Sequence, residues 1–309
     1  MSGNNEGYII DKLRASNSIA GGGGFPSFIQ LETVNGCTAR CVMCGIDEWS
    51  KKMNSNYMED ALFYKIADEI IENKESVNKV SLYVGNEPLM DKKIASRIAY
   101  FKENTIKVNF SSNASLMNEK RAKEILDSKI DHINFSVDGL DKGLYEKIRK
   151  GLKFTEVLGN VLKFIQIRDK YNYETSVRIS VIKHKAYEKD MQYICNFWSK
   201  ILDLKKGDSI RIDGLNNSIS VGNNRSSEIS LECAKLPCYV LWNTITIKTD
   251  GSIALCCVDQ CRTFKLGDLH KTTIKENWNN NAIRENIKQL HLQKGRMGVD
   301  VCKNCIAWL

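Results

Sequence analysis

Strands and helices alternate along the first two thirds of the chain. Apolar and polar residues alternate from Phe28 to Val34, which predicts a first strand. Further strand-like runs lie at 79–84, 107–111, 132–137, 177–182 and 209–212. Helical patterns lie between them, near 59–73, 91–104, 118–128, 141–149, 155–170 and 187–200. Repeated units of this kind predict a parallel sheet, here of six strands. Since a closed barrel needs about eight strands, we expect an α/β fold with a partial (β/α)6 TIM-like barrel over residues 28–213.

The pattern changes on either side of this barrel. Residues 214–232 are rich in Asn, Ser and Gly, which predicts a connection. Two alternating runs then flank Thr249-Asp250-Gly251, a hairpin signal, and a helical pattern follows over about 273–294. Residues 233–309 are therefore expected to form a small domain of a β-hairpin plus a helix. Residues 1–27 are polar and glycine-rich near their end, which predicts a flexible N-terminal extension.

Composition narrows the class of protein. No apolar run approaches the ~20 residues of a membrane span, and no secretory signal is visible. Eleven cysteines without such a signal indicate a reducing, cytoplasmic location and metal binding rather than disulfides. The 45 basic and 37 acidic residues give a net charge of +8, scattered rather than gathered in a basic face with aromatics. Nucleic acid is therefore not an expected partner; the excess fits a solvated surface or an anionic substrate.

Three cysteines directly follow the first strand. Cys37, Cys41 and Cys44 have C-x3-C-x2-C spacing, and the next cysteine in the chain is Cys195. Since a [4Fe–4S] cluster normally takes four thiolates, one iron of a cluster held here would stay open to a small molecule. A zinc site is the alternative, although it usually takes four ligands in C-x2-C pairs.

Polar motifs stand at the ends of the next three predicted strands. Gly85-Asn86-Glu87-Pro88 follows the second strand, Ser111-Ser112-Asn113 the third, and Ser136-Val137-Asp138-Gly139 the fourth. The third motif is followed by Tyr145-Glu-Lys-Ile-Arg149-Lys-Gly151. A turn explains the first motif and a helix cap the second equally well.

Together with the cysteines, these motifs resemble those of the radical S-adenosylmethionine (SAM) superfamily over about residues 28–212. The resemblance implies that a [4Fe–4S] cluster binds SAM and reduces it to a 5′-deoxyadenosyl radical, which abstracts a hydrogen atom from substrate. It also implies an electron donor such as flavodoxin or ferredoxin.

The resemblance further assigns SAM contacts residue by residue. Gly85 and Glu87 would receive the amino group, with Asn86 standing where the family has a second glycine. Ser111 and Asn113 would bind the ribose or the carboxylate. Ser136 and Arg149 would bind the carboxylate. Met43, where the family often has an aromatic residue, and Gly45 would meet the adenine through their backbones.

A second set of cysteines lies in the C-terminal domain. Cys238, Gly251 and Cys256 have C-x12-G-x4-C spacing, and Cys302-Lys-Asn-Cys305 follows. This arrangement resembles the twitch domain, a shortened SPASM domain, in which Cys238, Cys256, Cys302 and Cys305 would ligate one auxiliary [4Fe–4S] cluster. A zinc ribbon is the alternative. Cys233 is an alternative ligand to Cys238, and Cys195 lies in an apolar helical pattern typical of a buried residue.

The type of reaction is predicted from the residues that lie beside the C-terminal cysteines in the sequence. Strand alternation directs Cys257 away from Cys256, and resemblance to epimerases implies that Cys257 returns a hydrogen atom to the substrate radical. A purely structural Cys-Cys pair is the alternative. Cys261 is a second candidate donor, and Asp259 is a candidate proton acceptor for the other outcome, oxidation of an alcohol to a ketone.

We expect an epimerase acting on a sugar, an aminocyclitol, or a phosphorylated or nucleotide-linked sugar. A dehydrogenase and a ribosomal-peptide maturase are the alternatives within the superfamily. The peptide reading is less favoured because residues 1–27 are too short for a leader-recognition domain of about 80 residues. A zinc-binding interaction module and a tRNA-modifying enzyme are alternatives from other classes.

Overall fold

The computed structural model describes residues 24–49, 57–183, 185–214, 234–259, 264–303 and 305. The predicted extension up to Gly23, most of the predicted connection, Cys233 and Cys261 lie outside these residues. No helix of the described chain combines the length and the apolar composition that crossing a membrane needs.

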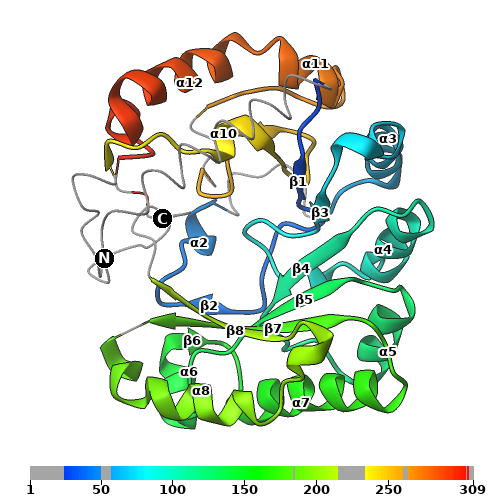
Figure 1. Cartoon of the computed structure of the whole chain (residues 1–309), viewed down its shortest axis with the longest axis vertical. Helices are drawn as coiled ribbons and strands as arrows, with labels where there is room; N and C mark the ends of the chain where they lie inside the picture. Colours follow the sequence, from blue (N-terminus) through cyan, green and yellow to red (C-terminus); the bar gives the residue numbers. More distant parts are fainter. Residues whose placement is uncertain are drawn as a thin grey trace.

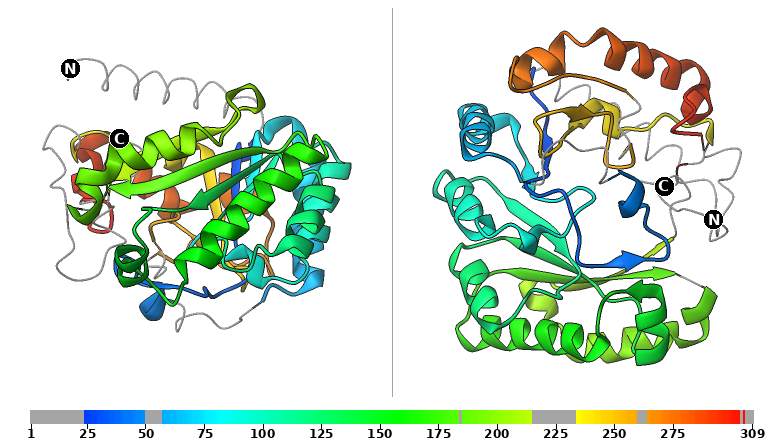
Figure 2. Two further views of the ribbon diagram at one scale, coloured as in Figure 1. Left: turned by 90° about the horizontal axis from the view of Figure 1, so that it is seen from below. Right: turned by 180° about the vertical axis from the view of Figure 1, so that it is seen from behind.

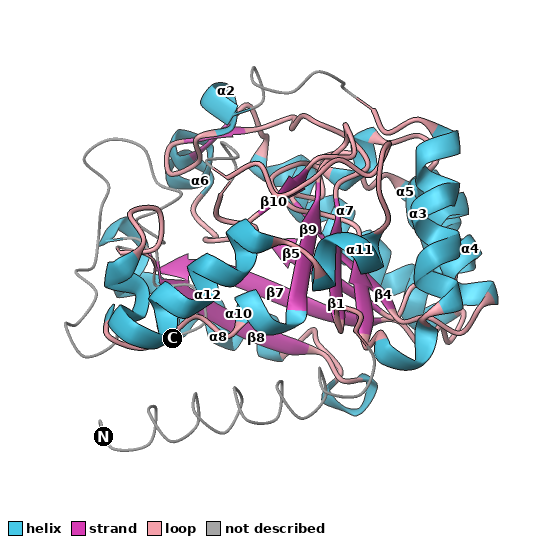
Figure 3. Cartoon of the chain, turned by 90° about the horizontal axis from the view of Figure 1, so that it is seen from above, coloured by secondary structure: helices cyan, strands magenta, loops and turns pink. Residues whose placement is uncertain are grey.

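Six parallel strands form the barrel sheet, in chain order and at the predicted places (Figure 1). They are β1 (Phe28–Leu31), β3 (Lys79–Ser81), β4 (Val108–Ser112), β5 (His132–Ser136), β7 (Ser176–Lys183) and β8 (Ser209–Gly214). The barrel helices are α3 (Asp60–Glu72), α4 (Ile94–Glu103), α5 (Glu119–Asp127), α6 (Lys142–Ile148), α7 (Phe154–Lys170) and α8 (Met191–Ser199). Helices surround the strands (Figure 3). The expected α/β fold with an incomplete barrel is confirmed.

The two faces of the sheet differ in polarity. On β5, Ile133 and Phe135 are fully buried, and the Phe135 ring lies 5.3 Å from that of Phe164 on α7. The alternate residues on the opposite, concave face are polar and bond from strand to strand. Asn134 Nδ2 donates to Ser111 Oγ (2.9 Å), and Ser180 Oγ donates to Asn134 Oδ1 (2.8 Å). The inside of the barrel is thus lined with polar side chains, as a polar ligand requires.

The C-terminal hairpin joins the barrel sheet. Its strands are β9 (Thr244–Ile247) and β10 (Ile253–Ala254). β9 pairs in parallel with β1, from Phe28↔Thr244 to Leu31↔Ile247, so the sheet has eight strands in the order β10-β9-β1-β3-β4-β5-β7-β8. Figure 2 shows β9 in yellow beside β1 in blue. The hairpin was predicted, whereas its pairing with β1 was not.

The helical pattern predicted over 273–294 forms two helices, α11 (Ile274–Asn279) and α12 (Ala282–Lys294), so the expectation of one helix is wrong. The break comes from Asn281, whose side chain accepts from the Arg284 amide (3.0 Å) and caps a new helix. The Glu69 carboxylate of α3 accepts from the Ile274 and Lys275 amides (2.7 and 2.9 Å). This contact holds the start of α11 on the barrel.

The remaining elements are short. They are β2 (Arg40–Cys41), β6 (Arg149–Lys150), α2 (Ile46–Trp49), α10 (Val240–Asn243) and the 3-10 helices Lys74–Ser76, Pro88–Met90, Lys185–Asp190, Leu204–Lys206 and Gly295–Gly298. β2 and β6 form a separate antiparallel ribbon.

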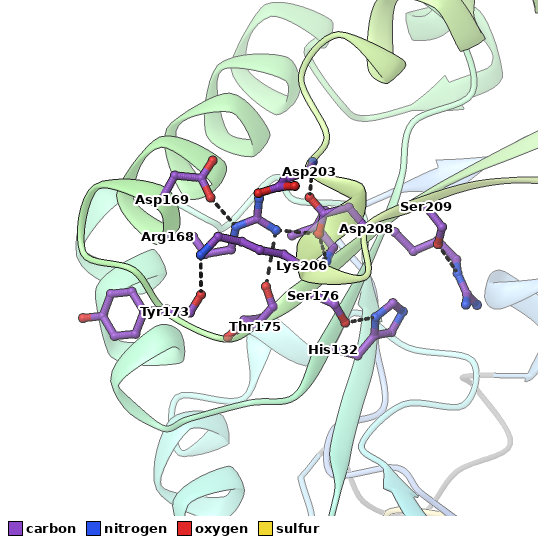
Figure 4. A network of polar contacts seen from close by, with 12 residues as sticks. His132, Arg168, Asp169, Tyr173, Thr175, Ser176, Asp203, Lys206, Asp208 and Ser209 are labelled. Carbon is purple, nitrogen blue, oxygen red and sulfur yellow. Dashed lines mark hydrogen bonds and ion pairs between the residues drawn. The ribbon is translucent and has the colours of Figure 1, made fainter.

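A buried network fixes the N-terminal ends of β7 and β8 (Figure 4). Arg168, at the end of α7, donates to Asp208 Oδ1 (2.6 Å) and to the Thr175 carbonyl (3.3 Å). Asp208 Oδ1 also accepts from the Val177 amide (2.7 Å). Because the predicted motifs follow the other ends of the strands, this network has a structural role and leaves the motif end for function.

Candidate functional site

The cysteine loop lies between the end of β1 and α2. The ribbon of β2 and β6 places Cys41 opposite Arg149, whose Nη1 lies 3.6 Å from Cys41 Sγ. Burial raises the pKa of Cys44 to about 12, and the neighbouring thiols of Cys41 and Cys37 also raise it. The three predicted cluster ligands therefore lie near one another.

N–H donors surround the sulfur atoms of this loop. Cys37 Sγ accepts from the Ala39 amide (3.4 Å) and from Asn113 Nδ2 (3.5 Å). Donors of this kind favour a thiolate over a thiol, whereas burial without a metal disfavours it. Three neighbouring thiols with N–H donors are thus a donor set that fits an iron–sulfur cluster.

Glu87 joins the cysteine loop to the end of β4. The side chain is buried, and its oxygens accept from Ser112 Oγ (2.7 Å) and from the amides of Asn113 (2.7 Å) and Leu89 (3.2 Å). Burial raises the pKa of Glu87 to about 7, against the effect of these donors. An ionised carboxylate accepts about four hydrogen bonds, which leaves about one for the predicted SAM amino group. Glu87 therefore also has a structural role that sequence reasoning missed.

The side chain of Asn86, which stands where the family has a glycine, has a structural role in the turn after β3. Its Oδ1 accepts from the Val84 amide (2.9 Å) and closes the turn at the end of β3. The neighbouring Gly85 amide donates to Glu32 Oε1 (3.3 Å), and Glu32 forms a buried ion pair with Lys248, which directly follows β9. Glu32 and Lys248 were not predicted, because 216 residues separate them.

The two polar residues predicted at the end of β4 occupy different places. Asn113 lies at the cysteine loop, where its Nδ2 also donates to Thr38 Oγ1 (3.0 Å). Ser111 lies deeper on the concave face, where it bonds the side chains of Asn134 and Tyr83. Ser136 lies on the same face, opposite Ser180 of β7. The structure thus brings Asn113 to the cysteines and leaves Ser111 in the polar lining of the barrel.

Arg149 forms an ion pair with Asp138, which was not predicted from the sequence. Its Nε and Nη2 donate to the two oxygens of the buried Asp138 (2.6 and 2.8 Å), and Nη1 faces Cys41. Asp138 also accepts from the Ile182 amide (2.9 Å). This bidentate pair holds the guanidinium at the cluster loop. The assignment of Arg149 to the SAM carboxylate stays a prediction.

Met43 and Gly45 flank Cys44 as the sequence requires. Met43 is buried in the core, and the Gly45 carbonyl accepts from the Glu48 amide (2.9 Å) in the first turn of α2. Their predicted backbone contacts with adenine stay predictions.

The four predicted auxiliary ligands lie near one another in the C-terminal part of the chain. Burial raises the pKa of Cys302 to about 12, and the thiols of Cys238 and Cys305 raise it further. Burial likewise raises the pKa of Cys256 strongly, with Cys238 and Cys302 among its neighbours. Each of the four thiols is near at least one of the others, a donor set that fits a second cluster. Among the described residues, no three His, Cys, Asp or Glu side chains surround a single metal-ion position.

Arg296 and Gly295 support this group and were not predicted. Arg296 is buried and its Nη1 donates to the Cys305 carbonyl (2.7 Å). Gly295 has φ +63°, and a Cβ there would lie 2.2 Å from backbone atoms of Lys235. Only glycine lets the two segments approach so closely.

Cys257 faces the concave side of the barrel while remaining near the auxiliary thiols. Burial raises its pKa to about 11, a hydrogen bond with the Gln30 side chain opposes the shift, and Cys305 and Cys238 lie nearby. The Cys257 thiol in turn raises the pKa of Tyr83, which is mainly raised by burial. β10 ends at Ala254, and Cys257 lies in the turn that follows it. The prediction that strand alternation sets the orientation of Cys257 is therefore wrong.

Asp259 lies with the auxiliary cysteines. Its buried carboxylate accepts from the Phe264 amide (3.4 Å) and raises the pKa of Cys302. The other candidate donor, Cys261, is outside the described chain.

Comparisons with known proteins agree with this arrangement. The model of the radical SAM superfamily matches residues 31–189, and that of an iron–sulfur cluster-binding domain (SPASM) matches residues 238–306. A probable GTP 3′,8-cyclase of Methanocaldococcus jannaschii is 26% identical over 170 residues, which are 55% of this chain and 54% of the relative. The chain thus spans about half the length of the curated relatives it matches.

Two solved structures share the fold. BtrN, in complex with AdoMet and 2-DOIA, has a TM-score of 0.61 at 16% identity, covering 91% of this chain and 93% of BtrN. SuiB of Streptococcus suis, bound to its precursor peptide SuiA, has a TM-score of 0.66 at 14% identity, covering 96% of this chain and 74% of SuiB. With the family model matching half of the chain, the protein belongs to the radical SAM superfamily and carries a C-terminal iron–sulfur domain.

Proposed function

We propose that this radical SAM enzyme is an epimerase of a small molecule, and that Cys257 returns a hydrogen atom to the substrate. The proposed substrates are a sugar, an aminocyclitol, or a phosphorylated or nucleotide-linked sugar. The observation that carries the proposal is the place of Cys257. It bonds Gln30 of β1 and lies near Tyr83, on the face of the barrel where polar side chains line the interior.

The cofactors are a SAM-binding [4Fe–4S] cluster, SAM and an auxiliary cluster. When bound and reduced, the first cluster and SAM supply a 5′-deoxyadenosyl radical that removes a hydrogen atom from carbon. Cys37, Cys41 and Cys44 would hold that cluster, with Asn113 and Arg149 donating to their sulfurs. Glu87 fixes Asn113 against the loop.

The proposed reaction requires that Cys257 be reduced again after each turnover. The substrate carbon loses one hydrogen atom and gains another from Cys257 Sγ on the opposite face, so the substrate composition is unchanged. The thiol is left as a thiyl radical. One electron and one proton restore it, and a one-electron donor such as reduced flavodoxin or ferredoxin would supply the electron.

Replacement of Cys257 tests the proposal. The reconstituted enzyme is assayed in deuterated water with a panel of sugars, aminocyclitols and sugar phosphates, and products are analysed by mass spectrometry and NMR. Wild type is expected to place one deuterium on an inverted carbon, and Cys257→Ala to give no inverted product. Cys195→Ala removes another thiol, on α8, and should behave as wild type. Unchanged product from Cys257→Ala, without solvent deuterium, would exclude the epimerase.

Alcohol oxidation is the second candidate, favoured by the auxiliary thiols lying near Cys257 and by the buried Asp259 beside them. An auxiliary cluster held there would accept the electron, and Asp259 the hydroxyl proton. The product would then be two hydrogen atoms lighter than the substrate, and its formation would require Asp259 but not Cys257. The same product analysis distinguishes the two reactions.

A further inference from the structure

Basic side chains lie on the concave face of the sheet, on β3, β7 and β8. Arg178 stands on β7, opposite Asn134 of β5 and Ser209 of β8, and its Nε donates to Ser209 Oγ (3.2 Å). Burial and then the charge of Arg178 lower the pKa of Lys79 at the start of β3. The two cations therefore lie within electrostatic reach of each other across the barrel.

This cationic pair has no counter-charge in the described part of the chain. Arg178 bonds only Ser209 there, and Lys79 Nζ lies over the Phe28 ring, 5.8 Å from its centroid. Several buried cations elsewhere are paired with carboxylates, as in Arg97–Asp91, Arg149–Asp138, Arg168–Asp208 and Lys248–Glu32. The buried Arg284 instead donates to the carbonyls of Leu241 and Thr244. Two partly buried like charges without a partner are unfavourable unless an anion joins them.

Tyr83 connects this pair to Cys257. Its hydroxyl bonds Ser111, and it lies near Arg178, Arg211 and the Cys257 thiol. Arg211 of β8 is the diagonal neighbour of Arg178 on the same face, because Arg178 pairs with Ser209 and Ser180 with Arg211. A molecule held by the arginines would thus extend past Tyr83 toward Cys257.

We propose that Arg178 and Lys79 bind an anionic group of the substrate, a phosphate or a carboxylate, and direct its carbon skeleton toward Cys257. The inference rests on the proposed function in that it takes the inside of the barrel as the substrate site. Guanidinium and ammonium groups both suit an oxyanion, and the guanidinium can bind it in a bidentate manner. An anionic substrate also explains why a barrel lining of hydroxyl and amide groups contains unpaired cations.

Binding of simple anions tests the site without knowledge of the substrate. The anaerobically reconstituted full chain is titrated calorimetrically with inorganic phosphate and, separately, with acetate at constant ionic strength. We expect saturable binding to wild type. Arg178→Gln and Lys79→Gln should each weaken it by about 10-fold or more, as the loss of one charge-assisted hydrogen bond predicts. Tighter binding of phosphate than acetate would assign a phosphorylated substrate, and the reverse order a carboxylate.

Lys74→Gln is the matched control. It removes the same charge at an exposed position after α3, and its affinity should stay within about twofold of wild type, the scale of non-specific screening. Arg178→Lys, which keeps the charge, should fall between wild type and Arg178→Gln, and it decides the role of Arg178 if the Gln variant does not take up iron. No saturable binding of either anion to wild type, or equal affinities in Arg178→Gln, Lys79→Gln and Lys74→Gln, would overturn the inference.

The radical chemistry is tested separately. Dithionite-reduced wild type is assayed for 5′-deoxyadenosine formation from SAM without any substrate. This assay can fail while anions still bind, and anions can fail to bind while SAM is cleaved, so a failure of the anion site is distinguishable from a failure of the radical chemistry.

Discussion

The ion pair between Glu32 and Lys248 offers a direct test of how the C-terminal segment is held on the barrel. Lys248 Nζ lies 2.8 Å from each Glu32 oxygen, and the side chains of Lys248 and Glu32 are 1% and 2% exposed. Lys248→Met leaves a buried carboxylate without its counter-charge, which should cost about 3–5 kcal/mol in the free energy of unfolding. Glu32→Gln combined with Lys248→Met removes both charges and keeps an acceptor for the Gly85 amide. The double variant should therefore cost at least about 2 kcal/mol less than Lys248→Met alone.

The assay is urea unfolding of the reconstituted protein, followed by tryptophan fluorescence. Lys123→Met is the control, since Lys123 pairs with Glu119 at 3.1 Å on the surface of α5 with 48% and 57% exposure. An exposed pair of this kind contributes little to stability, because water and salt screen it. If Lys248→Met lowered the unfolding midpoint no more than Lys123→Met, or if the double variant were less stable than Lys248→Met, the stabilising role of the buried pair would be refuted.

Three further variants test other parts of the molecule. Burial, with Arg178 and Lys79, lowers the pKa of His132 to about 4; the unfolded chain, with a value of about 6.5, then binds protons more tightly, so stability is complete above about pH 6.5 and falls toward pH 4. His132→Gln should remove this contribution, about 1–2 kcal/mol in the free energy of unfolding after solvent screening. The thermal midpoint should then depend less on pH, and an unchanged slope of the midpoint against pH would contradict this. Cys302→Ala should halve the iron content, from about eight to about four atoms per chain, in iron analysis that Cys195→Ala leaves unchanged; equal iron in both would remove Cys302 from the ligands. Gly295→Ala places a Cβ 2.2 Å from the Lys235 backbone at φ +63° and should cost at least about 1–3 kcal/mol, seen as a lower thermal midpoint; a normal midpoint would mean that the segments separate freely.

The strands and helices of the barrel could be predicted because each one is encoded by a local pattern of apolar and polar residues. Alternation of period two placed Ile133 and Phe135 on one face and His132 and Asn134 on the other, and the structure keeps that division. Helix ends are also local, but the cap at Asn281 is a single side chain within an uninterrupted apolar period, so the pattern gave one helix where there are two. Pairings between distant segments carry no such signal. Neither the register of β9 on β1 nor the pairing of Glu32 with Lys248 follows from periodicity, because each partner alone looks like any strand end.

Both sulfur groups depend on the strand pair β1 and β9. The chain leaves β1 through Glu32 and reaches Cys37 a few residues later, while β9 leads through Lys248 and the turn at Gly251 to Cys256 and Cys257. Four register pairs join the two strands, and the buried ion pair follows directly after them. The distance between the loop that starts the radical and the proposed hydrogen donor is therefore set by backbone hydrogen bonds rather than by a domain contact that can slide. An enzyme that must deliver a hydrogen atom to one face of a short-lived radical needs this constraint, because a shift of about 1 Å in a reacting group can cost about 100-fold in rate.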